Sequence, residues 1–475
     1  MKILLTGATG YIGKRLLPLL IEAGHEVICG VRDPLRFRVP ESLIDNISVI
    51  QLDLLDEKSL ENIPKDIDGA YLVHSMSSTG DFQAMEETSA INFREALNTT
   101  QVNHVIYLSG IVNESELSKH LDSRKKVEME LGKGNYNFTT FRAGIIIGSG
   151  SASFEIIRDL VEKLPIMITP KWLNTKCQPI GVSDVLGFLS KSLFQPETYN
   201  QNFDIGGPDI LTYKEMLLLF AKERNLNRKI WTVPIMTPKL SSYWLYFVTS
   251  TSYTLAASLV NSMHIEVICR DNRINKILDI TPISYQESLK KAFTKIDSNE
   301  ILSSWKDSYS SSGLSFNISD FIEVPTFGCF KDIKTQKVID RASSIDKIWS
   351  IGGETGWYYG DWLWELRGFM DKMVGGVGLR RGRTNPYSIN VGDSIDFWRV
   401  LYANKEEGRL LLFAEMILPG EAWLEFKMEG DQLIQTATFR PLGVAGRLYW
   451  YAVYPFHGFI FNGMISEIIR SEQSI

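Results

Sequence analysis

The residues with the clearest chemical meaning are three glycines near the start of the chain. Gly7, Gly10 and Gly13 follow the apolar run 3–5 and precede a helical pattern of apolar residues. In such a turn the first glycine allows a tight bend, the second lets the backbone approach a pyrophosphate, and the third lets helix pack on strand. Free N–H groups at the helix start then face the phosphates. The pattern predicts nucleotide binding, and a purely structural turn is the alternative.

A second charged motif bears on which nucleotide is bound. Arg32 directly follows the apolar segment 25–31, which is typical of a buried strand, and Asp33 comes next. At the end of this strand an arginine accommodates a ribose 2′-phosphate, whereas an acid binds a 2′-hydroxyl. Arg32, with Arg36 and Arg38 as helpers, therefore favours NADP over NAD. NAD remains the alternative because of Asp33.

These motifs need a scaffold, and the pattern along residues 1–148 provides one. Apolar strand candidates alternate with helical segments, which predicts an α/β Rossmann domain with a doubly wound parallel sheet. Ligands bind at the carboxyl ends of such strands. We expect residues 149–296 to form a small substrate lobe on this domain, so that the first domain spans 1–296.

The rest of the chain predicts a different domain. Residues 297–323 are Ser-rich and polar, as in a linker or exposed arm. Within 324–475, strand candidates such as 394–402 are separated by turn residues, and a long apolar segment over 445–469 predicts a closing helix. An antiparallel sheet against a long helix is an α+β helix-grip arrangement. His457, within an aromatic stretch, is interpreted as a packed or capping histidine.

Composition sets limits on function. The chain has 475 residues and a net charge of −6, so it lacks the basic field that a nucleic-acid partner would require. The four cysteines lie far apart and no metal-ligand spacing occurs, which predicts reduced thiols in a cytoplasmic protein without a metal. Residues 240–263 carry no charge. A buried or surface-docked helix pair is expected there, with a peripheral membrane contact as the alternative.

Several motifs together resemble a known family. They read TGATGYIG over 6–13, VRDP over 31–34, YLSG over 107–110, FRAGIIIGSGS over 141–151 and FDIGGP over 203–208. The chain resembles an atypical short-chain dehydrogenase/reductase (SDR), of the group in which an NmrA-like NAD(P)-binding half is fused to a C-terminal domain of unknown function. That domain is itself similar to START and polyketide-cyclase folds.

The resemblance implies cofactor roles for particular residues. Those expected at the pyrophosphate turn are Thr6, Gly7, Thr9, Gly10, Tyr11, Ile12 and Gly13. Arg32 would meet the 2′-phosphate, and Asp53 and Leu54 would flank the adenine. The residues expected near the nicotinamide and its ribose are His74, Ser75, Met76, Ala143, Gly144 and Ile145.

The catalytic pattern of the superfamily is altered. Its members pair a serine with Tyr-x-x-x-Lys on the next helix, and the tyrosine donates a proton. Ser109 is present here, but His120 stands in place of the tyrosine and Arg124 in place of the lysine. Histidine exchanges protons near neutral pH, whereas arginine does not. Either His120 is a substituted acid, or it is a surface residue and ordinary SDR catalysis is absent.

Two neighbours of Arg124 have structural interpretations. Ser123 is expected on the helix surface, and Glu128 is expected to pair with Arg124 at i,i+4 spacing.

The leading function is an NADP(H)-dependent oxidoreductase or isomerase acting on a small apolar molecule. The alternatives are a non-catalytic NADP(H) redox sensor and a carrier of a hydrophobic ligand.

Overall fold

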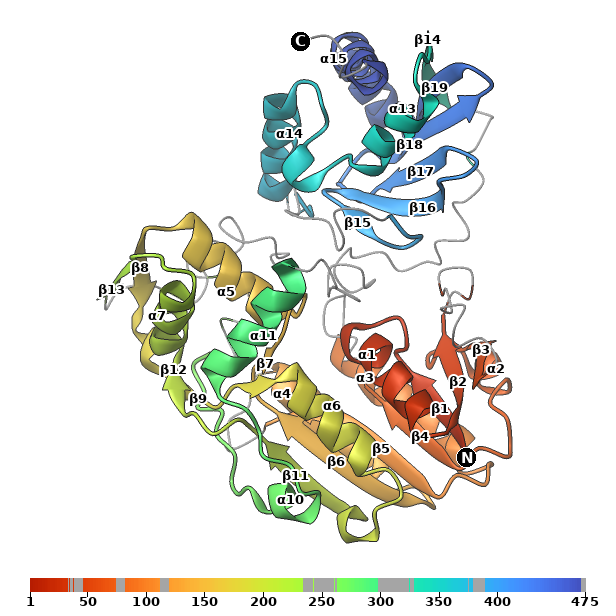
Figure 1. Ribbon diagram of the computed structural model, residues 1–475. Coiled ribbons are helices and arrows are strands. Elements are labelled where there is room, and N and C mark those ends of the chain that lie inside the picture. The colour runs from red at the N-terminus through yellow and green to blue at the C-terminus, as the bar shows by residue number, and fades with distance from the viewer. Residues whose placement is uncertain are drawn as a thin grey trace. The chain divides into compact units, whose positions relative to one another are not determined.

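The chain folds into two compact units, Met1–Gly313 and Leu314–Ile475. The computed structural model (Figure 1) describes residues 1–32, 34, 37, 46–73, 82–111, 119–233, 242, 260, 263–297, 324, 329–374, 376–378 and 389–470. The division falls within the predicted linker 297–323, of which residues 298–323 lie outside the described part.

The first unit contains a seven-stranded sheet in the order β11-β6-β5-β4-β1-β2-β3. All of its strand pairs are parallel, which confirms the predicted doubly wound sheet. The order reverses beside β1, and this switch point is where such sheets bind ligands. The strands are β1 (Lys2–Thr6), β2 (Glu26–Val31), β3 (Ile47–Gln51), β4 (Gly69–Leu72), β5 (His104–Gly110), β6 (Asn137–Ala143) and β11 (Gln201–Ile205).

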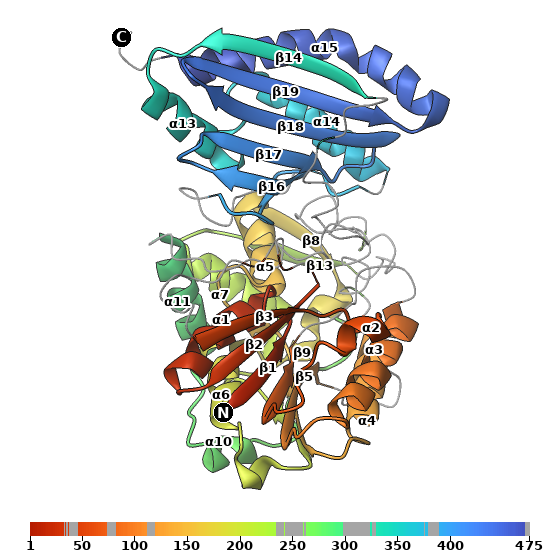
Figure 2. The ribbon, with the colours of Figure 1, turned by 90° about the vertical axis from the view of Figure 1, so that its right-hand side faces the viewer.

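Helices cover both faces of this sheet (Figures 1 and 2). Side chains alternate along each strand, so Ile3 and Leu5 enter the core beneath α1 and α6, whereas Leu4 enters the core beneath α3 and α4. Burial on both faces explains the apolar character of inner strands such as β1 and β4. The helices are α1 (Tyr11–Glu22), α2 (Glu57–Leu60), α3 (Phe82–Leu97), α4 (Lys119–Leu131) and α6 (Val182–Lys191).

The predicted lobe lies within this unit and is held by three short strand pairs. They are β7 (Ile146–Ile147) with β10 (Ile180–Gly181), β8 (Ile166–Pro170) with β13 (Lys229–Val233), and β9 (Lys176–Cys177) with β12 (Leu211–Thr212). The helices are α5 (Ala152–Lys163), α7 (Tyr213–Glu223), α10 (Arg273–Ile277) and α11 (Tyr285–Asp297). Phe154, Phe220 and Phe293 meet in its core, with ring centroids 5.1–5.6 Å apart. Most of segment 240–263 lies outside the described residues.

The second unit is a six-stranded antiparallel sheet in the order β14-β19-β18-β17-β16-β15, with a long helix on one face (Figure 2). Its strands are β14 (Phe330–Lys337), β15 (Ser394–Ile395), β16 (Trp398–Asn404), β17 (Arg409–Ala414), β18 (Gly420–Glu429) and β19 (Gln432–Pro441). Its helices are α13 (Arg341–Trp349), α14 (Asp361–Met373) and α15 (Gly443–Ile469). The predicted sheet and closing helix are confirmed.

One predicted strand of this unit was wrong. The segment 394–402 is not continuous, because β15 and β16 form a hairpin that turns at Asp396. The turn places Asp396 at φ 53°, and its carboxylate accepts a hydrogen bond from the indole of Trp357 at 2.7 Å. A buried tertiary contact therefore stabilises a left-handed residue that an apolar sequence pattern does not reveal.

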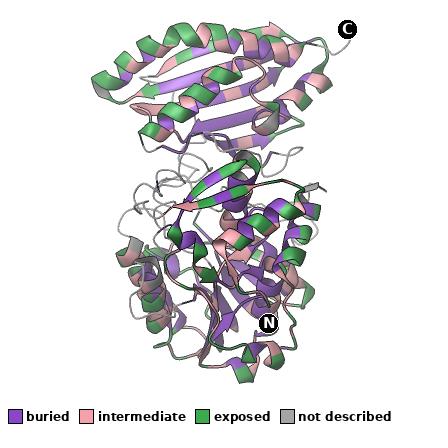
Figure 3. Cartoon of the chain, turned by 90° about the vertical axis from the view of Figure 1, so that its left-hand side faces the viewer, coloured by how far each residue is buried: buried purple, intermediate pink, exposed green. Residues whose placement is uncertain are grey.

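The interior of the second unit combines aromatic rings with a buried ion pair. Trp357 lies 5.0 Å from Trp364 between ring centroids, and both belong to the main core. Figure 3 shows long stretches of buried residues along the strands of this unit. Arg399 and Glu415 have no exposed side-chain surface and are joined by a contact of 2.6 Å.

Helix α15 is apolar on most sides, with Leu448 and Phe459 exposed. Among the described residues, no helix is long and apolar enough to cross a membrane.

Candidate functional site

The glycine turn joins β1 to α1 at the carboxyl edge of the sheet, and its geometry depends on all three glycines. Gly7 has a φ of 74°, in the left-handed region. A Cβ on Gly13 would lie 2.1 Å from the Gly7 carbonyl oxygen, and one on Gly10 would lie 3.1 Å from the same atom. Helix α1 has no side-chain cap and no acid in its first turn. Its N-terminal N–H groups therefore suit an anionic pyrophosphate.

Substitutions of Gly10 and Gly13 are expected to have different effects. We expect Gly13→Ala to destabilise the fold, because the new methyl group overlaps backbone atoms of the turn. Gly10→Val should leave the protein folded but abolish NADPH binding, since Gly10 has an ordinary φ of −84° and its side chain would occupy the approach to the backbone. Thermal unfolding and calorimetric titration separate the two effects. Normal NADPH binding by Gly10→Val would mean that the turn is only structural.

Two side chains of the predicted turn serve the fold instead of facing a ligand. The Thr6 hydroxyl donates a hydrogen bond to the Tyr71 carbonyl at 2.8 Å, and Thr6 is buried. The Arg15 guanidinium lies 4.1 Å from the centroid of the Tyr11 ring. Burial raises the pKa of Tyr11 to about 12. Thr6 and Tyr11 can therefore meet a cofactor mainly through their backbone.

The residues predicted around the adenosine follow the next strands. Arg32 is exposed directly after β2, and Asp53 follows β3 at the same edge of the sheet. The Asp53 carboxylate accepts a hydrogen bond from the Leu55 N–H at 3.0 Å, and Leu54 is buried in the core beneath α3. Six residues predicted for this site lie outside the described residues: Asp33, Arg36, Arg38, His74, Ser75 and Met76.

The segment predicted to approach the nicotinamide is tightly packed. Ala143 ends β6, and its carbonyl accepts a hydrogen bond from the Ile111 N–H at 3.1 Å. A Cβ on Gly144 would lie 3.1 Å from both the Gln178 carbonyl oxygen and a methyl carbon of Val267. The Ile145 carbonyl accepts a backbone hydrogen bond from the Ile180 N–H at 2.9 Å. Small residues are therefore required where the sheet meets the lobe.

At the end of β5 the structure brings two of the three catalytic candidates to one region. Ser109 is buried, and Tyr107 lies two residues earlier on the same face of the strand. Arg124 on α4 donates a hydrogen bond from Nη1 to the Tyr107 hydroxyl at 3.3 Å. Burial raises the pKa of Tyr107, and the positive charge of Arg124 opposes that rise. The Arg124 side chain is thus directed at a tyrosine of β5.

The surroundings of Arg124 contradict two sequence expectations. Ser123 is not on the helix surface, because it is 1% exposed and donates a hydrogen bond to Glu86. Glu128 pairs with Arg142 on β6 at 2.7 and 2.9 Å, not with Arg124. Tertiary partners replace the i,i+4 pair because α4 packs this side against the sheet. The side chain of the third candidate, His120, lies outside the described residues.

A small cavity lies beside these groups. It measures about 20 Å³ and is lined in part by Glu86, Ser89, Tyr107 and Arg124. Leu54, Leu72, Ala90 and Val127 form the apolar part of its lining, and its volume is about that of one water molecule. Sequence reasoning missed Tyr107 and Glu86. Tyr107 could have been found from the YLSG motif, where a period of two places it on the same face as Ser109.

A larger cleft, of about 280 Å³, forms where the lobe meets α1 and α6. Most of its lining is apolar, for example Pro18, Leu186 and Ala292. Two cationic residues, Arg15 and Lys291, also line it, and Arg15 donates a hydrogen bond to the Ser149 carbonyl at 2.9 Å. The lobe therefore adds a concave and largely apolar surface to the dinucleotide-binding scaffold.

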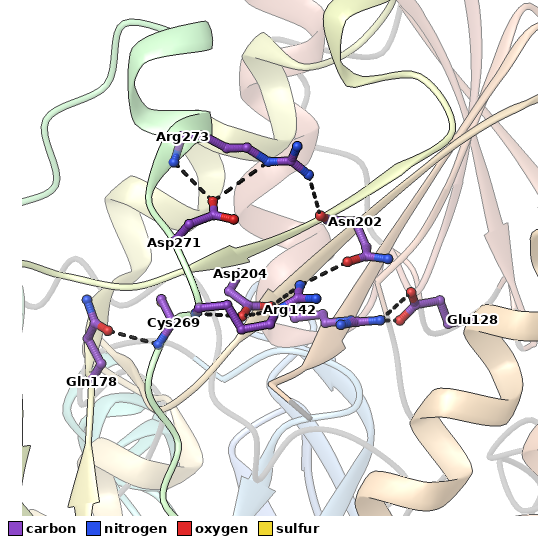
Figure 4. Close-up of polar contacts among 9 residues, drawn as sticks. Glu128, Arg142, Gln178, Asn202, Asp204, Cys269, Asp271 and Arg273 are labelled. Atoms are coloured by element: carbon purple, nitrogen blue, oxygen red, sulfur yellow. Dashed lines mark hydrogen bonds and ion pairs between the residues drawn. The ribbon is translucent and has the colours of Figure 1, made fainter. Parts of the chain in front are cut away.

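The FDIGGP motif anchors a distant segment at the sheet edge (Figure 4). Arg270 contacts both carboxylate oxygens of Asp204 on β11, at 2.7 and 2.8 Å. The Cys269 N–H donates to Gln178 Oε1 at 3.0 Å. A Cβ on Gly206 would lie 2.7 Å from Cys269 Sγ, so a larger residue there would force neighbouring side chains to move. This network has a structural role.

The described residues contain neither a disulfide nor a metal-binding cluster. The four cysteines are free, and burial raises the pKa of Cys29 and Cys177 to about 12. Within the described ranges, no group of three or more His, Cys, Asp or Glu side chains is placed to hold a metal ion.

Two stretches of the chain match known protein families, and the first unit is similar to several known proteins. Residues 7–140 match a family described as NAD(P)H-binding, and residues 329–464 match a family of unknown function, DUF2867. Photosystem II assembly factor Ycf39 of Trieres chinensis is 26% identical, over 51% of this chain and 75% of that protein. Divinyl chlorophyllide a 8-vinyl-reductase of Arabidopsis thaliana is 24% identical, over 50% of this chain and 60% of the reductase. The maize reductase is matched over 55% of its length.

Solved structures share the fold of the first unit. Triphenylmethane reductase of Citrobacter, complexed with NADP(H), has a TM-score of 0.50 and 15% identity, covering 62% of this chain and 100% of that one. The NADPH-dependent quinone oxidoreductase QOR2 of Escherichia coli, complexed with NADPH, also has a TM-score of 0.50, with 16% identity, covering 61% and 99%.

Fold and site together define an NAD(P)H-binding Rossmann domain of the atypical short-chain dehydrogenase/reductase class. Within that class, the domain is NmrA-like, and this chain joins it to a DUF2867 domain.

Proposed function

We propose that the first unit is an NADPH-dependent reductase that acts on an apolar, conjugated small molecule. The observation that carries this proposal is the contact of Arg124 with Tyr107 at the position where the superfamily has its lysine. Two of the similar proteins are named as reductases and a third as a quinone oxidoreductase, and their names refer to a chlorophyllide, to triphenylmethane and to a quinone. The apolar lining of the lobe cleft also supports an apolar ligand.

Arg124 cannot transfer a proton, and this limits the mechanism that the site can support. A bound nicotinamide cofactor supplies the hydride. Arginine stays protonated at ordinary pH, so Arg124 is a positioning residue that holds Tyr107 and the end of β5. Ser109 would orient an oxygen of the substrate, and His120 would donate the proton. A conjugated acceptor spreads the developing negative charge over several atoms, so its reduction depends less on a strong acid beside one oxygen than the reduction of a simple carbonyl does.

The proposed preference for NADPH rests on Arg32. It is exposed at the end of β2, where a 2′-phosphate would lie. A charged hydrogen bond contributes roughly 1.5–3 kcal/mol, so we expect Arg32→Ala to weaken NADPH binding about 10- to 150-fold while NADH binding stays unchanged. Calorimetric titration with both cofactors measures this difference. An unchanged preference would assign the 2′-phosphate to other residues.

Oxidation of NADPH in the presence of an enone, a naphthoquinone or an aliphatic aldehyde tests the reductase proposal. We expect turnover of the conjugated compounds and little turnover of the aldehyde. His120→Ala should lower turnover far more than NADPH affinity, and it should remove the fall in rate as the pH rises through 6–7, roughly the ordinary histidine range. His264→Ala serves as the control, because His264 packs against Trp172 in the lobe.

Three outcomes would count against this proposal in different ways. Equal turnover of the aldehyde would contradict the restriction to conjugated acceptors. Full turnover by His120→Ala would identify His120 as a bystander. Tight NADPH binding without turnover of any compound would favour a redox sensor over a reductase.

A further inference from the structure

Helix α14 of the second unit carries large apolar side chains on the side that faces away from the core of its unit. Its buried positions are Trp364, Gly368 and Asp371, which are four and three residues apart and therefore mark one side of the helix. A surface helix normally directs polar residues to the solvent. Here the opposite side forms an apolar stripe of residues that are 48–64% exposed, namely Trp362, Leu366, Phe369, Met370 and Met373.

The stripe has the spacing of a seam between two packed helices. From Trp362 to Met373 its members recur at intervals of four, three and four residues, with Met370 beside them. Apolar residues have this spacing where one helix pairs with another. Single exposed apolar residues are common on protein surfaces, whereas a contiguous apolar patch marks an interaction site. We therefore expect the stripe to pack against a second apolar helix.

Exposed apolar residues next to α14 widen this patch. The ring of Tyr359, just before α14, lies 5.1 Å from that of Phe459 on α15, and Phe459 is 56% exposed. Further along α14, Ile417 is 51% exposed, and its N–H donates a hydrogen bond to Asp371 Oδ1 at 2.7 Å. A specific interface buries about 800 Å² on each partner, more than a single short helix offers. The neighbouring residues add to the area that the stripe presents.

The charged residues beside the stripe indicate what kind of helix it meets. Glu365 is exposed and Lys372 is half-buried. They are seven residues, or about two helical turns, apart, so both lie on one flank of the stripe. The other flank carries Leu363 and Met370. In two antiparallel helices related by a two-fold axis, each flank meets the same flank of the other copy. Glu365 of each copy then lies beside the partner's Lys372, whereas a parallel pair would bring these charges against the apolar flank.

We propose that the chain forms a symmetric dimer in which α14 pairs in antiparallel fashion with α14 of a second copy. A two-fold interface uses the same patch on both subunits, so the patch must be self-complementary. The α14 flank meets this requirement, because its acid and its base exchange partners across the axis. The positive end of each helix dipole also lies beside the negative end of the other. An anionic lipid surface fits less well, because the exposed acids Asp361 and Glu365 stand beside the stripe.

Sedimentation equilibrium of the full chain tests the interface. We expect a dimer at micromolar concentration, and Leu366→Glu should give a folded monomer by circular dichroism, because Leu366 is 48% exposed within one chain. Ile333→Glu is the matched control, since Ile333 is 56% exposed but lies on β14, and it should remain dimeric. A natural chain that is monomeric at about 100 μM would overturn the proposal.

Exchange of charges on α14 tests the antiparallel register. Glu365→Lys alone and Lys372→Glu alone should each raise the dimer Kd about tenfold, because two attractive pairs become repulsive. An equal mixture of the two variants should form a heterodimer, since one chain then carries a lysine at both positions and the other a glutamate at both. The double variant Glu365→Lys/Lys372→Glu should dimerise like the natural chain.

Three further results would contradict the proposal in different ways. Dimerisation that is unaffected by Leu366→Glu would place the interface on another surface. Unchanged dimerisation by both single charge variants, with Leu366→Glu monomeric, would show that α14 pairs in a different orientation. A monomeric chain that binds vesicles of phosphatidylcholine and phosphatidylserine, and loses this binding with Leu366→Glu, would assign the stripe to a membrane surface.

Discussion

Replacing Arg399 with methionine should destabilise the second unit by about 3–5 kcal/mol, because Glu415 would remain buried without its main cationic partner. Both side chains are fully buried, and Arg399 also donates a hydrogen bond to the Gly392 carbonyl at 2.7 Å. Removing one member of a buried pair costs more than removing both, so an Arg399→Met/Glu415→Leu double variant should recover much of the loss. Urea unfolding followed by tryptophan fluorescence measures the differences.

A neighbouring pair supplies the control for this experiment. Arg409 and Glu425 join the next two strands at 2.8 Å, but their side chains are 31% and 20% exposed. Partial exposure to solvent screens the charges, so Arg409→Met should cost no more than about 1 kcal/mol. If the two arginine variants lose similar stability, then burial does not determine the contribution of these ion pairs.

The second large effect concerns the pH dependence of the first unit. His104 is fully buried, and burial lowers its pKa to about 4. Its Nδ1 accepts a hydrogen bond from the Phe194 N–H at 3.0 Å, so Nδ1 carries no proton. Nε2 lies 2.8 Å from the Thr139 hydroxyl, which itself donates to the Thr198 carbonyl. Nε2 is therefore the protonated nitrogen, and the neutral ring is fully satisfied.

The neutral state of folded His104 determines how the free energy of unfolding changes with pH. Below its ordinary pKa of about 6.5, His104 takes up a proton in the unfolded chain but not in the folded one. The free energy of unfolding should therefore fall as the pH drops from about 6.5 towards 4, by about 3 kcal/mol in total. Urea titrations across this range, compared with those of His104→Leu, isolate the contribution. Equal slopes for the two proteins would contradict the prediction.

The parts of the protein that sequence reasoning predicted correctly are those encoded by local patterns. The Gly7–Gly13 turn, the alternation that gives the parallel sheet, and the long C-terminal helix each occupy one continuous stretch of sequence. The contacts that sequence reasoning missed join residues that are far apart in the sequence. Glu128 reaches Arg142 on a neighbouring strand, and Arg124 reaches Tyr107, so the spacing along α4 alone misassigned both side chains.

The order of strands in the second unit has a consequence for synthesis. Strands β15 to β19 pair with successive neighbours, so each hairpin can form soon after its residues are made. Strand β14 is different, because its register joins Phe330 to Phe439 and Lys337 to Gln432. During translation β14 therefore emerges first, yet its neighbour β19 is made last among the strands. Until β19 is complete, β14 has no neighbouring strand in this sheet, and after pairing with β19 it remains the edge strand of the sheet.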